Sequence, residues 1–172
     1  MSDRITEQTT LCVYCPKMCR VACPIAEASG REEVTPWSLM TLLAHVRDGR
    51  LALDAEIATL FHQCNGCGRC KTFCAHENDV PTALHAGRQL AAHAGLVPRA
   101  ALAAVDRVRH TGNVKGENLA ARQRELLGDR VGADAKTLFF AGDDALSSGA
   151  QGLVDAVKVL EHLGYGPIAL LE

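Results

Sequence analysis

The sequence is poor in aromatic side chains, and several common functional patterns are missing from it. One Trp, two Tyr and four Phe among 172 residues leave the core to be built mainly from Leu, Ala and Val. No apolar run approaches the ~20 residues that a helix needs to cross a bilayer. The formal net charge is -2 and no long basic run is present, so nothing favours a nucleic-acid partner. The sequence also has no Ser-His-Asp arrangement, phosphate-binding loop or dinucleotide glycine pattern.

The overall composition is that of a folded protein. Apolar residues make up 48% and charged residues 22%, as in a globular chain of one domain, or of one domain and part of a second. The segment 1–11 is polar and lacks the apolar core of a secretory signal. We therefore expect a cytoplasmic protein, either free or peripheral on the cytoplasmic face of a membrane. In that compartment cysteines bind metals more often than they form disulfides.

The eight cysteines form two groups of four, each with three closely spaced thiols and a fourth that trails by three intervening residues. The groups are Cys12, Cys15, Cys19 and Cys23, and then Cys64, Cys67, Cys70 and Cys74. The second group follows the first at offsets of 52, 52, 51 and 51 residues. This spacing is typical of a domain that binds two 4Fe-4S clusters, in which each iron takes one protein thiolate.

The fourth ligand of each cluster is predicted to come from the other group. Three thiolates of one tight loop can reach three corners of a cubane, but the same loop cannot wrap around to the far corner. In two-cluster proteins the fourth cysteine of each group serves the other cluster. The predicted sets are Cys12, Cys15, Cys19 and Cys74 for cluster 1, and Cys64, Cys67, Cys70 and Cys23 for cluster 2. No catalytic residue is predicted, because all eight thiols serve as ligands.

The two cysteine loops differ in detail. Pro16-Lys17-Met18 puts three residues between the second and third cysteines of the first group, where two are usual. This insertion leaves open whether the first cluster is an ordinary cubane. Ala75 stands where a proline often follows the fourth cysteine. In the second group, Gly66 and Gly68 allow backbone amides to approach the sulfurs without steric penalty.

Zinc is the main alternative to iron–sulfur clusters, because structural zinc also uses four cysteines. The thiols of each group lie too close in sequence for two knuckles separated by a longer loop, and the same spacing recurs in both groups. His62 and His76 flank the second group, but eight thiolates already complete two clusters. Four basic residues either offset the negative charge of the clusters or are ordinary solvated charges: Lys17, Arg20, Arg69 and Lys71.

Most of the chain has helical patterning. We expect a loose lead-in over 1–11 and a connector over 24–34. Helices are predicted to begin at capping, proline or charged residues: Thr35-Pro36, Asp54, Pro81, Pro98 and Glu117. The helix after Pro98 has Leu102, Val105 and Val108 on one face.

The pattern changes near residue 136. A short apolar run at 137–141 predicts a strand, 147–163 an amphipathic helix, and 168–171 a second strand. These elements make one βαβ unit, which normally belongs to a larger parallel sheet. The predicted fold is therefore mainly α. An all-helical cysteine domain is predicted over 1–130, and 136–172 is predicted to begin an α/β domain that stops too soon.

With the cysteines placed, the chain resembles the N-terminal part of iron–sulfur subunits related to heterodisulfide reductase and to glycolate or lactate oxidase. The resemblance rests on Cys-Val-Tyr-Cys-Pro-Lys-Met-Cys-Arg-Val-Ala-Cys-Pro at 12–24 and Cys-Asn-Gly-Cys-Gly-Arg-Cys-Lys-Thr-Phe-Cys at 64–74. Val80-Pro81, the segment 112–118 and the strand at 137–141 also fit. The resemblance implies an α-helical ferredoxin domain followed by a cysteine-rich α/β domain of the CCG type. It also implies electron relay from an FAD-linked flavoprotein dehydrogenase towards a quinone or another acceptor.

The leading hypothesis is therefore an electron-transfer protein or subunit with two 4Fe-4S clusters. An alternative is a metal-stabilised structural or regulatory module that works through protein contacts. A third is the catalytic subunit of a disulfide reductase or hydroxy-acid oxidase. The sequence argues against the third, because it has no flavin-binding residues and none of the family's Cys-Cys-Gly motifs.

Overall fold

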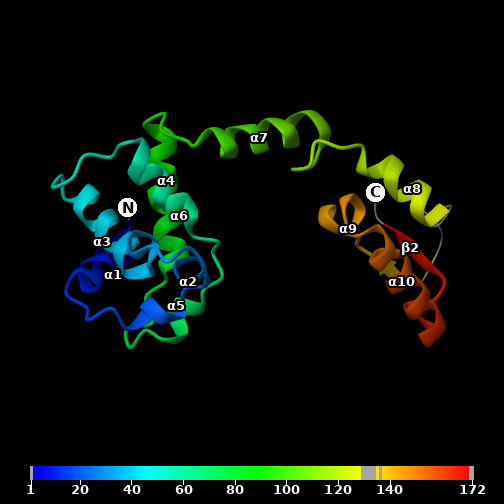
Figure 1. Ribbon diagram of the computed structural model, residues 1–172, viewed down its shortest axis with the longest axis horizontal. Helices are drawn as coiled ribbons and strands as arrows, with labels where there is room; N and C mark the ends of the chain where they lie inside the picture. Colours follow the sequence, from blue (N-terminus) through cyan, green and yellow to red (C-terminus); the bar gives the residue numbers. More distant parts are fainter. Residues whose placement is uncertain (1, 129–134, 136, 171–172) are drawn as a thin grey trace. The chain divides into compact units, whose positions relative to one another are not determined.

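The computed structural model describes residues 2–128, 135 and 137–170, and this part of the chain is mainly helical (Figure 1). It divides into two compact units, Met1–Arg99 and Ala100–Glu172. The predicted domain boundary lies later, between 130 and 136. The difference arises because apolar residues shortly before 130, among them Leu119 and Leu127, belong to the core of the second unit.

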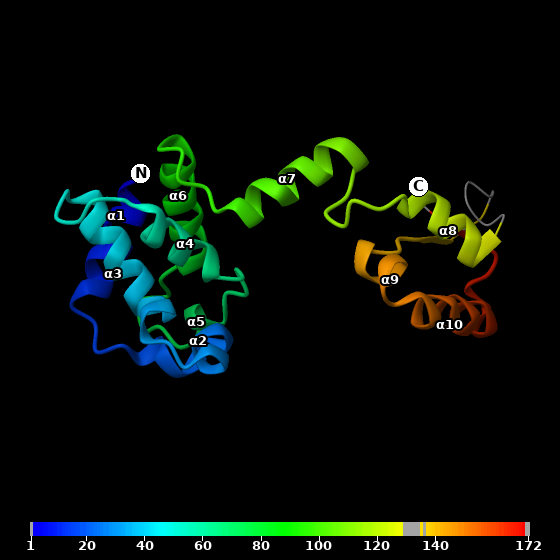
Figure 2. The ribbon, with the colours of Figure 1, turned by 45° about the horizontal axis from the view of Figure 1, so that its top comes forward.

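The first unit contains six α-helices and two short 3-10 turns in its described residues. They are α1 (Asp3–Val13), the turn Met18–Ala22, α2 (Pro24–Ser29), the turn Glu32–Val34, α3 (Pro36–Arg47), α4 (Ala55–Gln63), α5 (Arg69–Thr72) and α6 (Val80–His93). The expected connector over 24–34 is thus largely helical. The helices α2 and α5 lie at the same end of the unit (Figures 1 and 2).

Two of these helices begin where their capping residues predict. The Thr35 hydroxyl accepts a hydrogen bond from the Ser38 amide at 3.3 Å, at the start of α3. The Asp54 carboxylate accepts one from the Ile57 amide at 2.8 Å, at the start of α4. Each side chain satisfies a backbone N–H that has no partner inside its helix. These caps fix the start of the helix that leads into the second cysteine group.

The helix α1 contradicts the predicted lead-in over 1–11. Ser2 caps its first turn, accepting a backbone hydrogen bond at 3.4 Å. Arg47 of α3 then donates to the Thr6 carbonyl at 2.8 Å and to the Thr9 hydroxyl at 2.7 Å. A largely polar helix is therefore docked by hydrogen bonds to another helix, which hydrophobic periodicity does not reveal. Its C-terminal turn carries the first cysteine, so this docking helps to place a predicted ligand.

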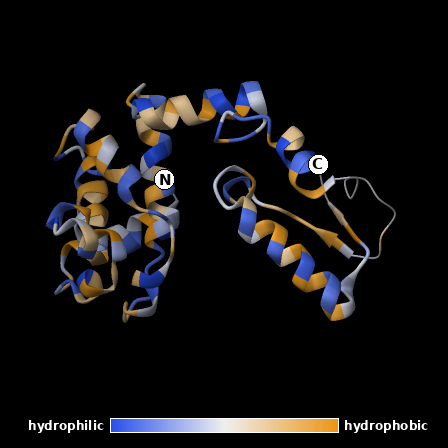
Figure 3. Cartoon of the chain, turned by 45° about the vertical axis from the view of Figure 1, so that its right-hand side comes forward, coloured by the Kyte–Doolittle hydropathy of each residue, from blue (hydrophilic) through white to orange (hydrophobic). Residues whose placement is uncertain are grey.

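The core of the first unit lies between α3, α4 and α6. Phe61 is fully buried there with Leu43 and Leu84. The approach of α6 depends on Gly87, because a Cβ at this position would lie 3.1 Å from the Phe61 ring and 3.3 Å from a Leu43 methyl. The expected core of mainly Leu, Ala and Val is present, with one aromatic ring added. Figure 3 shows apolar and polar residues distributed around the helices.

The second unit follows α7 (Arg99–Thr111), a helix that begins at the last residue of the first unit. Its further described elements are α8 (Leu119–Leu127), β1 (Thr137–Phe139), α9 (Asp143–Ser147), α10 (Ala150–Leu160), a π-helical turn Glu161–Tyr165 and β2 (Ile168–Leu170). The strands β1 and β2 pair in parallel, with Leu138 opposite Ala169. Leu153 and Val157 of α10 are buried, as the amphipathic pattern predicts. The predicted helix over 147–163 is interrupted near Gly149, where α9 and α10 are separate. That this unit begins a larger α/β domain stays a prediction.

The apolar face of α7 is on the surface. Leu102, Val105 and Val108 are 48%, 45% and 43% exposed, and no residue of this helix is buried within the described chain. No helix in the described ranges is both long enough and apolar enough to cross a membrane.

Candidate metal centre

The eight cysteines lie at helix ends and in the short loops between helices, all within the first unit. Cys12 lies near the end of α1, Cys23 directly before α2, Cys64 directly after α4, and Cys70 within α5. All eight are free thiols. Their loops turn sharply, with Lys17, Gly66 and Gly68 at positive φ. The helices therefore fix the ends of each cysteine loop, while the loops direct several thiols inward.

A first cavity, of about 210 Å³, is walled by thiols from both groups. Its cysteines are Cys12, Cys15, Cys19, Cys70 and Cys74. Trp37, His76 and Asn78 also line this cavity. Cys74 thus lies with the first three thiols of the other group.

A second, narrower cavity of about 20 Å³ takes the remaining thiols. Its cysteines are Cys23, Cys64, Cys67 and Cys70. Cys23 thus lies with three thiols of the second group, and Cys70 borders both cavities. This is the grouping that crossed ligand sets require; the ligand sets themselves stay a prediction.

Burial raises the pKa of three of these thiols, Cys12, Cys19 and Cys70, and so disfavours their ionised forms. Burial, reinforced by repulsion from Cys19, Cys74 and Cys15 and opposed by a hydrogen bond from Asn78, raises the pKa of Cys12 to about 11. Because thiolates bind metals, metal binding here must release protons and supply the positive charge that the buried thiolates lack.

The thiol of Cys70, which lines both cavities, also has a raised pKa. Burial, together with repulsion from Cys19, Cys64 and Cys67, raises the pKa of Cys70 to about 12. Burial also raises the pKa of Cys19. Cys70 therefore interacts electrostatically with thiols of both cavities, and the two cavities lie next to each other.

Sulfurs in both cysteine groups receive hydrogen bonds from nitrogen donors. The Gly66 amide donates to Cys64 Sγ at 3.4 Å, as its glycine-containing loop predicts. Asn78 Nδ2 donates to Cys12 Sγ at 3.2 Å. Asn78 lies in the short turn 76–79, which no sequence pattern connected with the cysteines, so this contact was not predicted. Its approach to Cys12 depends on the packing of α1, which no local pattern predicts.

The basic residues near the first loop pair with a carboxylate. Lys17 lies 3.5 Å and Arg20 2.6 Å from Glu32, and all three side chains are exposed. Lys17 also lies 4.1 Å from the centre of the Trp37 ring. These contacts favour the interpretation of the two cations as surface charges.

The two histidines that flank the second cysteine group have different surroundings. His62 Nδ1 is 2.9 Å from the Ala58 carbonyl of its own helix, whereas His76 lines the first cavity. Among the residues that the structure describes, no three His, Cys, Asp or Glu side chains converge closely enough to hold a single metal ion.

The residues of the first cavity fit an iron–sulfur cluster. Its thiols surround a hollow much larger than one ion, and an amide N–H points at one of the sulfurs. Both features suit a multi-iron group that is bound by sulfur and stabilised by hydrogen bonds to sulfur. The second cavity is also lined by cysteine thiols, but at about 20 Å³ it must widen to admit an iron–sulfur cluster. The exposure of Cys67 at its edge leaves room for this movement.

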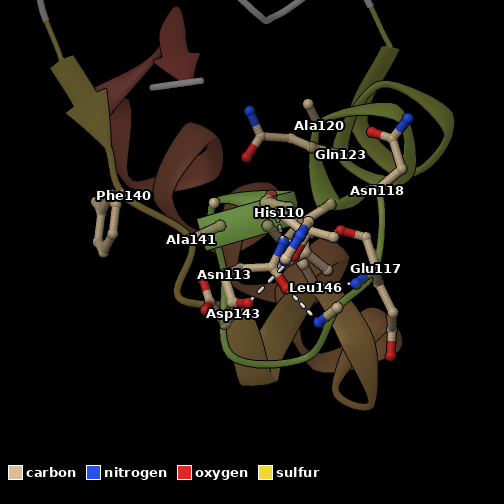
Figure 4. Close-up of a pocket in the computed structure, with 14 residues that line it drawn as sticks. His110, Asn113, Glu117, Asn118, Ala120, Gln123, Phe140, Ala141, Asp143 and Leu146 are labelled. Carbon is tan, nitrogen blue, oxygen red and sulfur yellow. Dashed lines mark hydrogen bonds between the residues drawn. The ribbon is translucent and has the colours of Figure 1, made fainter. Parts of the chain in front are cut away.

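A larger hollow, of about 650 Å³, lies in the second unit and contains no cysteine (Figure 4). Its floor is the loop 111–118, which Asn113 holds together. The Asn113 side chain donates to the Glu117 carbonyl at 2.8 Å and accepts from the Gly116 amide at 2.9 Å. The Glu117 carboxylate in turn accepts from the Ser147 hydroxyl at 2.9 Å. These polar groups stabilise the loop, so the Gly-Asn and Gly-Glu-Asn residues of the sequence have a structural role here.

Comparison with known proteins gives one family match. Residues 8–78 match the family described as the 4Fe-4S dicluster domain. The matched segment contains all eight cysteines but spans less than half of the chain. No curated protein and no solved structure matches the chain. The match supports an iron–sulfur, ferredoxin-like protein with a role in electron transfer.

Proposed function

We propose that the chain relays single electrons through two 4Fe-4S clusters held in its two thiol-walled cavities. The observation that carries the proposal is the sorting of the thiols. Each cavity takes three cysteines of one group and the fourth of the other, and Cys70 borders both. The crossed ligand sets account for this sorting, with the second cavity widening to hold its cluster.

The residues of the chain hold, bury and tune the clusters. The helices α1, α4 and α5 present thiols at their ends, and the apolar core beneath them excludes water from one side of each cavity. N–H groups of Asn78 and Gly66 contact two of the sulfurs. The clusters supply reversible one-electron redox chemistry, and the protein sets their potential through hydrogen bonds, burial and charge. No bond-making residue is needed for this role.

The donor and acceptor are proposed from the resemblance. An FAD-linked dehydrogenase of the hydroxy-acid or heterodisulfide type would supply electrons, and a quinone or another acceptor would receive them. In this proposal the first unit is an α-helical ferredoxin domain, and the parallel pair β1 and β2 begins an α/β domain of the CCG type. The complex would work in the cytoplasm or at the cytoplasmic face of a membrane.

The test is the metal content and redox activity of the anaerobically purified protein. We expect about eight irons and eight acid-labile sulfides per chain, because two cubanes hold that number, together with two reversible one-electron signals. A colourless, zinc-loaded protein with no redox signal would refute the proposal and favour a metal-stabilised interaction module. An iron content below about seven would argue against two intact clusters.

A further inference from the structure

Asn78 is a buried amide of which only one half is satisfied. Its side chain lies in the wall of the first cavity, and the residue is 3% exposed. Nδ2 donates to Cys12 Sγ at 3.2 Å and to the Gln8 carbonyl at 3.2 Å. Oδ1 is buried and has no hydrogen-bond partner in the described structure. Because an unpaired buried oxygen is costly, the placement of Nδ2 must compensate for it.

A donor in this position acts differently on the two redox states of a cluster. Reduction adds negative charge that is shared by the cysteine sulfurs. An N–H group aimed at one of these sulfurs therefore stabilises the reduced state more than the oxidised state. The short distance and the exclusion of water strengthen the effect, since the dielectric constant is low around buried groups. The expected result is a higher reduction potential.

We propose that Asn78 raises the reduction potential of the cluster bound by Cys12, through its N–H···S hydrogen bond. The inference rests on the proposed function, because it requires a cluster at this cavity. Asn78 is a tuning residue that acts through Cys12 and is not itself a ligand.

The two sites are unequal in this respect. Within the described ranges, Cys12 alone among the cysteines receives a hydrogen bond from a side chain. In the second group, the donor to Cys64 is the Gly66 backbone amide, at the longer distance of 3.4 Å. Substitution can therefore remove the donor from one cluster and leave the other as an internal reference.

Asn78 also links the turn to α1, and this structural role must be separated from tuning. A second link runs in parallel, because the Gln8 side-chain carbonyl accepts a hydrogen bond from the Asp79 amide at 3.3 Å. Gln8→Leu breaks that link and leaves the donor to Cys12 in place. It is thus a matched control for loosening of the same contact between the turn and α1.

The experiment compares wild type, Asn78→Leu, Asn78→Asp and Gln8→Leu as anaerobic holoproteins. Redox titration followed by electron paramagnetic resonance gives the two midpoint potentials, and resonance Raman gives the Fe–S(Cys) stretching frequencies. Both Asn78 variants should lower one potential, by about a tenfold change in the redox equilibrium, or about 59 mV for one electron. They should also shift the Fe–S(Cys) frequencies, while the other potential stays in place and Gln8→Leu matches wild type.

Four other outcomes would contradict the tuning role of Asn78 or the proposed function. Unchanged potentials in both Asn78 variants would overturn the inference. An equal shift in Gln8→Leu would do the same, because it would trace the effect to the packing of α1. Loss of the cluster from both Asn78 variants would show that Asn78 maintains the site rather than tunes it. Wild-type protein without two redox-active clusters would instead refute the proposed function itself.

Discussion

Arg88 ties the end of α4 to the loop that carries the second cysteine group. Its Nε donates to the Phe61 carbonyl at 2.8 Å, and its guanidinium also donates to the Cys64 carbonyl. The last carbonyls of a helix have no partner within it, and a cation nearby is favourable for the helix dipole. Arg88→Met keeps the apolar stem but leaves both carbonyls without this donor.

The size of the effect follows from these two bonds. A hydrogen bond that involves a charged group contributes about 1.5–3 kcal/mol. Arg88 is only half-buried, so water replaces part of what is lost. We therefore expect the closed state of the loop to lose about 2 kcal/mol, which is about a 30-fold change in the opening equilibrium.

Cluster loss under a chelator measures this opening. The visible absorbance of the anaerobic holoprotein should bleach in two phases in Arg88→Met, one of them about 30-fold faster than in wild type. Gln89→Met is the matched control, because Gln89 is exposed and its side chain contacts His85 one turn away on the same helix. A bleaching rate within about threefold of wild type in Arg88→Met would refute the view that Arg88 holds the loop closed.

Three further predictions concern the core, a glycine and the ligand sets. Phe61→Ala should destabilise the first unit by about 3–5 kcal/mol, because the ring is fully buried; a loss below about 1 kcal/mol in urea unfolding would contradict this. Gly116→Ala should destabilise the second unit by about 1–3 kcal/mol, since φ is 77° and the new Cβ would lie 2.9 Å from the Arg107 side chain. Gly142→Ala, with open space at its Cβ, should leave the melting temperature nearly unchanged, and equal effects of the two would refute the argument. Cys74→Ser should damage the cluster that the first group mainly holds, and spectroscopic loss of the other cluster alone would overturn the crossed ligand sets.

Local patterns predicted the elements whose ends carry their own signals. Thr35 and Asp54 cap their helices through hydrogen bonds to residues three positions away, so the cause lies within one turn of sequence. Leu153 and Val157 are buried because a helical repeat placed them on one face. The cysteine spacing likewise identified all eight thiols that wall the two cavities.

Long-range hydrogen bonds account for what the sequence did not reveal. The helix α1 docks through Arg47, which is 38 residues from the Thr9 hydroxyl that it contacts. Asn78 reaches Cys12 across 66 residues. Neither contact is marked in the sequence by a hydrophobic repeat or by a motif. The two contact units divide before the predicted domain boundary for a related reason, because Leu119 and Leu127 share a core with residues beyond 140.

The position of Cys70 has a consequence for how the protein matures. This thiol borders both cavities, and it lies in α5, a helix of only four residues that is soon followed by Cys74. A helix this short has little stability of its own. Filling either cavity would therefore order the backbone that the other cavity also needs. Under the proposed function, insertion of one cluster would lower the entropic cost of inserting the other, so metallation should be cooperative and half-loaded molecules should be scarce at equilibrium.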